Sequence, residues 1–303
     1  MECSRMINRE DLGDGTHPLL FFLGDGDEKH PRANSLLVGE ILIDAGITPS
    51  VMQEISKEHT INKILLSHWH EDHVSGVRCF PGAQVECHVL DKHPIISFND
   101  MVELYGQEIL HDDFLTYMKY YHLQESTIEK TFTGGEIKHA STGQQVKIIH
   151  APGHSAGHSC FHVIPNDILF MIDTWVPGLG PWYGARDASI SSYLETTRML
   201  RSLDADRALL SHSNKILEND ELNGLLDEIV RIIQDRNSRL MNGLKETMPM
   251  SLDAIRRKPV LPGDMASFEE PFNKSRTIAI RNHLAFLEET GKIISTPRGF
   301  LLT

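Results

Sequence analysis

Ser67-His68-Trp69-His70-Glu71-Asp72-His73 places three imidazoles and two carboxylates directly after an apolar run of the chain. The preceding residues, Lys63-Ile64-Leu65-Leu66, have the composition of a buried strand. Imidazole and carboxylate are the ligand types that suit zinc, iron and manganese. His68 and His70, at alternate positions, can face one centre while the last two residues turn towards a second. A polar surface turn is the alternative interpretation, but this density of ligand-type side chains favours half of a metal site.

Short apolar runs on both sides of this segment predict an α/β architecture. A helix is expected from about residue 50 to 58, directly before the strand that leads to the histidines. Other strands are expected at 19–22, 35–38, 41–44, 146–149, 160–164 and 168–172. Because scaffolds of this class place their chemistry in strand-end loops, we expect the functional residues at these strand ends.

The last third of the chain predicts a different local arrangement. A long helix is expected from about 219 to 244, followed by a break that contains proline. Beyond the break, apolar residues at helical spacing end at Gly291, and a two-stranded hairpin is expected over 293–302. A helix followed by a hairpin is typical of a winged helix. We therefore predict a metal-binding catalytic domain at 1–244 and a winged-helix-like domain at 245–303.

Composition narrows the class of protein. The chain has 303 residues, is 40% hydrophobic and carries a net charge of −13, which argues against broad attraction to nucleic acid or an anionic membrane. Residues 245–303 differ, since they contain nine basic and seven acidic side chains. No run approaches the roughly 18 apolar residues of a membrane span, and the first ten residues lack the apolar stretch of a secretion signal. We expect a cytoplasmic protein.

Three further residues supply ligand types that the first segment lacks. His154 lies in a tight turn after a predicted strand, Asp173 follows the apolar run Leu169-Phe170-Met171-Ile172, and His212 follows Ala208-Leu209-Leu210-Ser211. Each of them comes at a predicted strand end. Together with the first segment, they favour a complete metal site rather than isolated structural residues.

These pieces resemble the metallo-β-lactamase superfamily. The matching pieces, in order, are Ile41-Leu42-Ile43-Asp44-Ala45-Gly46, His68-Trp69-His70-Glu71-Asp72-His73, Pro152-Gly153-His154, Ile172-Asp173 and Ser211-His212. The resemblance implies an α/β protein with a four-layer αββα fold. It also implies two divalent metal ions, zinc first, with manganese or iron as alternatives. The implied ligands are His68, His70 and His154 on one ion, Asp72, His73 and His212 on the other, and Asp173 on both; Asp44 is implied to support a ligand imidazole.

The chemistry that follows is hydrolysis by a hydroxide held between two metal ions. Asp72 or Asp173 could orient this nucleophile and accept its proton, which makes them the candidate catalytic residues. Hydrolysis of this kind needs no serine or cysteine nucleophile.

The arrangement of a metal domain, a long helix and a C-terminal winged helix is similar to the β-lactamase-like-protein-2 branch, which also resembles the hydroxyacylglutathione hydrolases (glyoxalase II) in its core. This resemblance implies hydrolysis of a small thioester or ester, which the acidic composition favours. Metal-dependent endoribonuclease activity on single-stranded RNA is the alternative, which a nucleic-acid-binding winged helix would favour. A persulfide dioxygenase with one iron on His68, His154 and Asp173 is a third hypothesis, and a purely nucleic-acid-binding protein is a fourth. The winged helix is also a candidate packing or homodimerisation element.

Aromatic residues near the predicted site are candidates for substrate contact. Trp175, Trp182 and Tyr183 come soon after Asp173, and Tyr117 lies in an aromatic, helical stretch over about 100–130 that could form a lid. The alternative is that these side chains only pack against the core.

Overall fold

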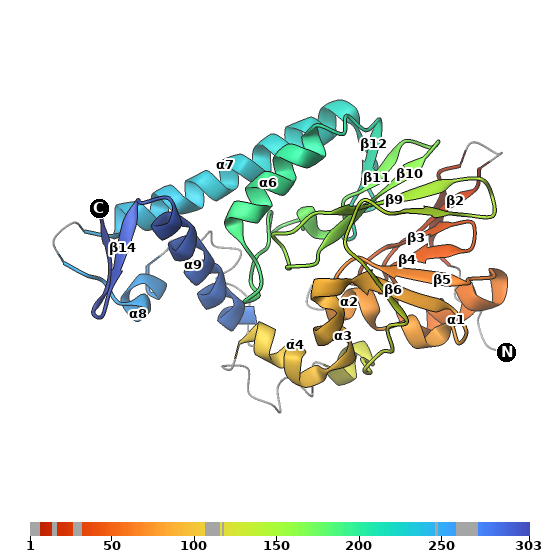
Figure 1. Cartoon of the computed structure of the whole chain (residues 1–303), viewed down its shortest axis with the longest axis horizontal. Coiled ribbons are helices and arrows are strands. Elements are labelled where there is room, and N and C mark those ends of the chain that lie inside the picture. Colours follow the sequence, from red (N-terminus) through yellow and green to blue (C-terminus); the bar gives the residue numbers. More distant parts are fainter. Residues whose placement is uncertain are drawn as a thin grey trace.

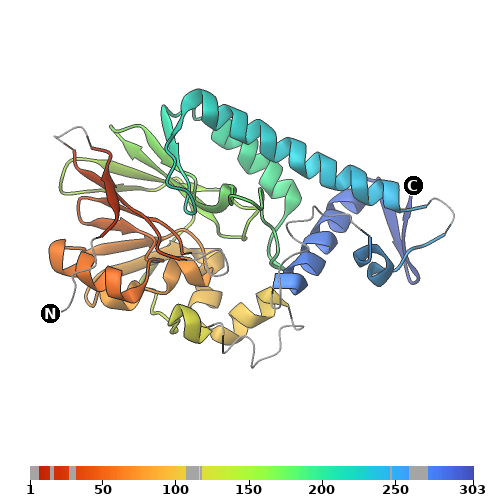
Figure 2. The same cartoon turned by 180° about the vertical axis from the view of Figure 1, so that it is seen from behind.

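The computed structural model describes residues 7–13, 17–26, 32–106, 116, 118–245, 248–258 and 272–303. Within these ranges, two β-sheets lie face to face, with helices on the outer side of each (Figures 1 and 2). One sheet has the order β1 (Arg9–Asp11), β2 (Leu19–Phe22), β3 (Ser35–Val38), β4 (Ile41–Ile43), β5 (Lys63–Leu66), β6 (Gln84–His88) and β7 (Lys130–Phe132). The other has the order β13 (Leu217–Glu218), β12 (Arg207–Leu209), β11 (Ile168–Phe170), β10 (Ser159–Ile164), β9 (Gln145–His150) and β8 (Ile137–His139).

Helices connect and cover these sheets. The helical segments are α1 (Pro49–Glu58), α2 (Glu71–Val74), η1 (Val77–Cys79), η2 (Val89–Asp91), α3 (Lys92–Ile96), α4 (Phe98–Tyr105), η3 (Ile172–Thr174), α6 (Ile190–Arg201), α7 (Asn219–Gly243), α8 (Leu252–Arg256) and α9 (Phe272–Glu289). The chain ends in a hairpin of β14 (Ile293–Thr296) and β15 (Gly299–Leu302). No helix of the described ranges is long and apolar enough to cross a membrane.

Side chains that alternate along each strand pack on the two faces of its sheet and so form separate layers. Leu36 belongs to the apolar cluster between the two sheets, whereas its neighbour Leu37 belongs to the cluster beneath α1. In the second sheet, Ile148 faces the first sheet and Ile149 faces α6 and α7. Because successive side chains of a strand point to opposite faces, both faces must be apolar, and the strands appear in the sequence as continuous apolar runs. The predicted αββα layering is confirmed.

Parallel pairing brings the predicted strand ends together. β4 and β5 are parallel, with Ile43 opposite Leu65, so the loops that follow them leave the same edge of the first sheet. In the second sheet β11 and β12 are parallel, with Phe170 opposite Leu209. The four loops that contain Asp44 and the predicted ligands other than His154 therefore begin at carboxyl ends of paired parallel strands.

The C-terminal segment packs on the second sheet. The long helix α7 starts with a capping box between Glu218 and Glu221, which satisfies two backbone N–H groups of its first turn. Ile255, Ile280 and Leu284 belong to the same apolar cluster as the outer face of the second sheet. The expected helix and hairpin are confirmed, whereas the winged-helix assignment and the boundary after residue 244 stay predictions.

Two expected elements differ in extent. The strand expected at 168–172 ends at Phe170, because Ile172 has a φ of +56° and starts the turn η3. Of the helical stretch expected over 100–130, α4 ends at Tyr105 before Gly106, whose φ is +94°, and residues 123–129 are not helical. Part of that stretch, residues 107–115 and 117, lies outside the described ranges.

Candidate metal centre

All seven predicted ligands meet between the two sheets. Their ligand atoms form two groups, and within each group these atoms lie within 4.8 Å of one another. The first group is His68, His70, His154 and Asp173, and the second is Asp72, His73 and His212. The residues come from four separate loops, so this His/Asp cluster is compatible with a dinuclear metal centre.

Local backbone geometry explains how the first segment serves both groups. β5 ends at Leu66, and His68 and His70 follow in the chain before the next helix. The one-turn helix α2 then begins at Glu71 and turns Asp72 and His73 towards the second group. On the opposite sheet, Gly153 has a φ of +138° in the turn before His154, a conformation that side chains other than glycine rarely adopt.

The first group brings three imidazole nitrogens close together. Nδ1 of His154 donates to the carbonyl oxygen of Trp182 at 2.9 Å, so its Nε2 carries no proton in the neutral ring. This Nε2 lies 3.2 Å from Nε2 of His68 and 3.0 Å from Nδ1 of His70. Imidazole nitrogens are ligands that zinc and iron bind, and these three lie close enough to share one ion, so the donor set fits a metal ion.

The carboxylate of Asp173 lies between the groups. Its Oδ2 is 3.5 Å from Nε2 of His154 and 3.8 Å from Nε2 of His68. Its Oδ1 is 3.4 Å from Nε2 of His73 and 3.5 Å from Nε2 of His212. One oxygen thus faces each group, which is the placement that a bridging carboxylate needs.

Asp44 orients His73 in the second group. Oδ2 of Asp44 lies 2.7 Å from Nδ1 of His73, and the carboxylate also accepts hydrogen bonds from N and Oγ of Ser67. Nε2 of His73 therefore faces the cluster, where it is shielded from solvent and has no hydrogen-bond partner. An orphaned buried nitrogen beside carboxylates fits a metal ligand, because a bound ion would satisfy it.

The two groups differ in their affinity for protons. Burial, with repulsion between the imidazoles, lowers the pKa of His70 to about 4 and that of His154 to about 3, and holds the pKa of His68 well below its usual range. Burial also disfavours charge on His212, but Asp173 and Asp72 outweigh it and raise its pKa to about 9. The imidazoles of the first group are therefore neutral near pH 7, the form that binds metal, and the second group is strongly attractive to cations.

The structure reveals two acids beneath the His154 turn that the sequence did not single out, Asp91, which is buried, and Asp187, which is partly buried. Asp91 accepts hydrogen bonds from N of Gly157 at 2.6 Å and from Oγ of Ser155 at 2.7 Å. Asp187 accepts from N of Ala156 at 3.0 Å. Neither acid lies in a recognisable motif, so no sequence signal identifies them.

Trp69 and Glu71, which lie between predicted ligands in the sequence, each have a specific partner. The indole Nε1 of Trp69 donates to Asp187 at 3.1 Å. The hydroxyl of Tyr105 donates to Glu71 at 2.5 Å, and its ring stacks on that of His70 with centroids 5.7 Å apart. Trp69 and Asp187 are 118 positions apart and Glu71 and Tyr105 are 34 apart, so no local sequence signal identifies these partners.

His158 has a defined structural contact near the cluster. Its Nδ1 donates to the carbonyl oxygen of Ala151 at 2.9 Å, and its Nε2 accepts from N of Asp173 at 3.3 Å. The ring therefore fixes the backbone of Asp173.

The four candidate substrate contacts fall in different environments. Trp175 and Trp182 are partly buried. Tyr183 is buried, and its hydroxyl lies 2.6 Å from Nη1 of Arg236 and 2.7 Å from Nε2 of His283. Tyr117 lies outside the described residues. Substrate contact by these residues stays a prediction, and the partners of Tyr183 point to an interior role.

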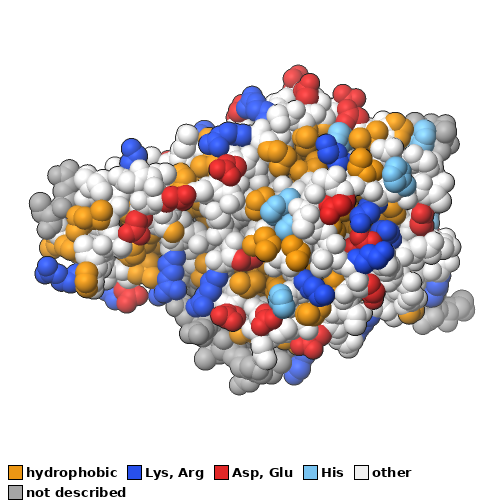
Figure 3. Space-filling model, viewed as in Figure 1, with side chains coloured by type: hydrophobic (Ala, Val, Ile, Leu, Met, Phe, Trp, Pro, Cys, Tyr) orange, Lys and Arg blue, Asp and Glu red, His pale blue; other side chains and the backbone are white. Residues whose placement is uncertain are grey.

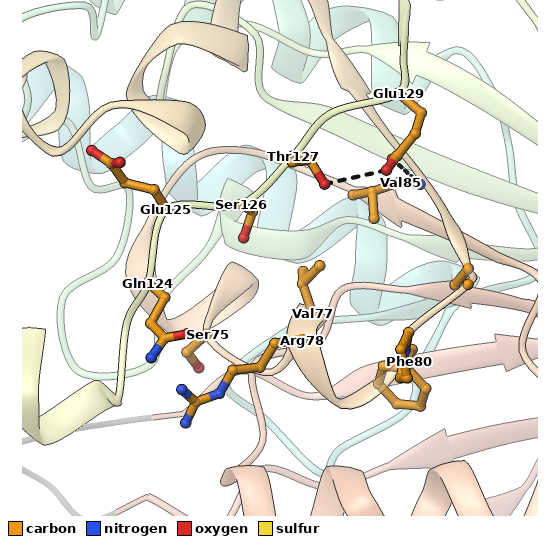
Figure 4. Close-up of a pocket in the computed structure, with 13 residues that line it drawn as sticks. Ser75, Val77, Arg78, Phe80, Val85, Gln124, Glu125, Ser126, Thr127 and Glu129 are labelled. Carbon is orange, nitrogen blue, oxygen red and sulfur yellow. Dashed lines mark hydrogen bonds between the residues drawn. The ribbon is translucent and has the colours of Figure 1, made fainter.

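A separate pocket does not belong to the cluster. It has a volume of about 240 Å³ and lies between η1 and residues 124–129 (Figure 4). Arg78, Gln124 and Ser126 contribute polar side chains to its lining, which includes none of the seven predicted ligands. The metal chemistry is therefore not expected there.

The part of the chain that carries the cluster is similar to known proteins. The model of the metallo-beta-lactamase superfamily matches residues 32–212. The chain is 24% identical over 285 residues to the beta-lactamase-like protein 2 homolog of Drosophila melanogaster, with 93% of this chain and 82% of that protein covered. It is 26% identical over 209 residues to the atrochrysone carboxyl ACP thioesterase of Aspergillus fumigatus, with 66% of this chain and 51% of that protein covered.

A solved structure has the same overall fold. The metallo-beta-lactamase family protein from Thermus thermophilus aligns with a TM-score of 0.70 and 17% identity, covering 94% of this chain and 98% of that one. Against curated relatives the coverage is lower, since the chain spans 39% to 82% of the length of five that it matches.

Proposed function

The chain belongs to the metallo-beta-lactamase superfamily, and we propose that it is a metal-dependent hydrolase that acts on a thioester or ester. The observation that carries this proposal is the convergence of seven His and Asp side chains in two adjacent groups. The thioester class is supported by the Aspergillus relative, whose name describes a thioesterase.

The proposed roles follow from the geometry. Two bound divalent ions, zinc first, would activate a water molecule and polarise the substrate carbonyl. His68, His70 and His154 would hold one ion and Asp72, His73 and His212 the other, with Asp173 between them. Asp72, whose Oδ2 lies 3.2 Å from Nε2 of His212, is placed to orient the attacking water and accept its proton.

The three cysteines in the described part of the chain support water as the nucleophile. Cys79, Cys87 and Cys160 are buried. Burial raises the pKa of Cys87 and of Cys160 to about 12. Because the thiolate is the reactive form of cysteine, these two thiols are inert near neutral pH.

A panel of acyl-thioesters tests this proposal. The metal-loaded protein is incubated with each thioester, and thiol release is measured against the Asp72→Ala variant. We expect release that the variant loses, together with about two equivalents of zinc or manganese per chain. A protein that holds one equivalent of iron and consumes oxygen, or that leaves the whole panel intact, would contradict the proposal.

Cleavage of single-stranded RNA is the second candidate, supported by an arginine-lined pocket. Arg256, Arg257 and Arg276 line a pocket of about 360 Å³ with Asp253 and Thr277. Nε of Arg276 is shielded from solvent and has no hydrogen-bond partner. Such a pocket in the predicted winged-helix-like segment suits a phosphate group.

Two observations make RNA the second choice. The net charge of the chain is −13, and Figure 3 shows acidic and basic side chains intermingled over one face. Labelled single-stranded RNA decides between the candidates. Cleavage that Asp72→Ala abolishes and Arg257→Gln weakens, with no thioester turnover, would favour the ribonuclease.

A further inference from the structure

Arg236 of α7 is a buried cation among neutral partners. The residue is 2% exposed. Nη1 donates to the carbonyl oxygen of Pro181 at 2.8 Å and to the hydroxyl of Tyr183 at 2.6 Å, and Nη2 donates to the carbonyl oxygen of Leu179 at 2.7 Å. Burying a guanidinium is costly unless it is hydrogen-bonded. The loop 179–183 is therefore tied to α7 by strong, charge-assisted bonds.

The hydrogen bonds that continue from Arg236 have a fixed direction. Arginine can only donate, so the Tyr183 hydroxyl accepts from it and must donate to Nε2 of His283, 2.7 Å away. His283 is then neutral with its proton on Nδ1, which donates to Oδ1 of Asn237 at 2.7 Å. Burial and the nearby Arg236 hold the pKa of His283 well below its usual range, which agrees with this assignment.

Helix α9 holds the same loop through a second residue. Nδ2 of Asn282 donates to the carbonyl oxygens of Tyr183 at 3.0 Å and Ala185 at 3.1 Å. The loop is thus fixed by α7 on one side and by α9 on the other. Figure 1 shows both helices beside the chain segment that leads into α6.

The other side of this loop contacts the His/Asp cluster. The carbonyl oxygen of Trp182 accepts the Nδ1 proton of His154, and Trp182 lies between Pro181 and Tyr183, two of the three residues that Arg236 binds. That bond fixes the tautomer and ring orientation of His154, so that its Nε2 faces the other ligands of the first group. A shift of the loop would move this carbonyl and release the imidazole.

We propose that Arg236, Tyr183 and His283 are positioning residues that hold His154 in its ligand orientation through the carbonyl of Trp182. The proposal rests on the proposed metal centre but is independent of the substrate. It makes the C-terminal segment part of the support of the centre. Deletion of residues 246–303 would remove Asn282 and His283 from the loop, so loss of activity on truncation would not identify an RNA-binding role.

Metal titration of full-length variants tests this proposal. Tyr183→Phe removes the hydroxyl that joins Arg236 to His283 and keeps the ring volume, and Arg236→Met removes the whole guanidinium. Arg231→Gln is the control, because Arg231 is on the same helix but exposed and paired with Glu228. Metal-free protein is titrated with zinc in competition with a chelator. We expect one of two equivalents to bind about 10- to 100-fold more weakly in both variants, with the other equivalent and the control unchanged.

A second readout uses the metal-free protein. The side-chain ¹H–¹⁵N signal of His154 Nδ1–H reports its bond to Trp182, and we expect exchange with water to accelerate in Tyr183→Phe. Wild-type zinc binding together with an unchanged His154 signal would overturn the proposal. If Arg236→Met fails to fold, Tyr183→Phe decides. A wild-type chain that binds no zinc would overturn the metal centre, whereas absent thioester turnover with normal zinc binding would overturn only the substrate assignment.

Discussion

Oδ2 of Asp44 lies 2.7 Å from Nδ1 of His73, and the backbone of Asp44 has a φ of +58°. Both features come from the tight turn after β4, which places the carboxylate under the second ligand group. Asparagine tolerates this left-handed backbone, whereas most residues would be strained there. Asp44→Asn therefore removes the charge without disturbing the turn.

We predict that Asp44→Asn weakens metal binding at the second group by about 10- to 100-fold, because the amide no longer fixes His73 as the carboxylate does. Zinc titration measures the effect. Asp167→Asn is a matched control, since Asp167 also has a positive φ, +49°, and pairs with His162 at 2.5 Å away from the cluster. Equal effects in both variants would contradict the predicted role of Asp44.

The bridging placement of Asp173 predicts a difference in metal content between two variants. His212→Ala removes a nitrogen from one group only, so we expect one equivalent of zinc to remain. Asp173→Ala removes the carboxylate that faces both groups, so we expect both equivalents to be lost or greatly weakened. Elemental analysis after gel filtration measures the content. One retained equivalent in Asp173→Ala would show that this carboxylate does not bridge.

Gly46 is predicted to be intolerant of any side chain. A Cβ at this position would lie 1.6 Å from the carbonyl oxygen of Asp72. Gly46→Ala should therefore displace the loop of the second group and cost about 1–3 kcal/mol of stability, the usual range for overpacking. Gly224→Ala on α7 meets nothing within 4 Å and should instead gain about 0.5–1 kcal/mol. Urea denaturation of both variants tests the contrast, and an unchanged Gly46→Ala would refute it.

Asp91 predicts a pH dependence of stability. Burial, together with Asp187, raises its pKa to about 8, against opposing hydrogen bonds from Ser155 and Gly157. Between about pH 4 and about pH 8, Asp91 keeps its proton in the folded protein and loses it in the unfolded chain. The stability that protonated Asp91 contributes is therefore fully present below about pH 4 and is lost as pH rises through about 8. The slope is at most about 1.4 kcal/mol per pH unit.

Asp91→Asn should remove this contribution, because the amide does not titrate. We expect its melting temperature to fall less than that of the wild type between pH 6 and pH 9. Asp206→Asn, at an exposed position, should follow the wild type. Parallel curves for Asp91→Asn and wild type would contradict the buried, protonated state of Asp91.

Much of the fold could be predicted from the sequence, because strands buried on both faces produce short apolar runs. The predicted strands at 19–22 and 35–38 match β2 and β3, and the predicted helix at 219–244 matches α7 within one residue. The predicted end of a strand was wrong where the backbone takes a positive φ, as at Ile172. Such a conformation depends on the packing of the turn and has no signal in an isoleucine.

Ligand-type residues at strand ends were equally visible in the sequence, because a ligand set is a matter of residue type and local position. All seven predicted ligands lie in the cluster. Apart from Asp44, the residues that support these ligands were not visible in the sequence. Trp69 and Asp187 are separated by 118 positions, and Arg236 and Pro181 by 55.

The sequence by itself determined the layers, the strand ends and the residue types of the His/Asp cluster, because local periodicity and side-chain chemistry encode them. Only the tertiary structure decided which oxygen of Asp173 faces which group, and that Arg236 and Trp182 together hold His154. These contacts join distant segments through buried polar atoms. Their partners are fixed by the requirement that each buried donor and acceptor be satisfied within the folded chain.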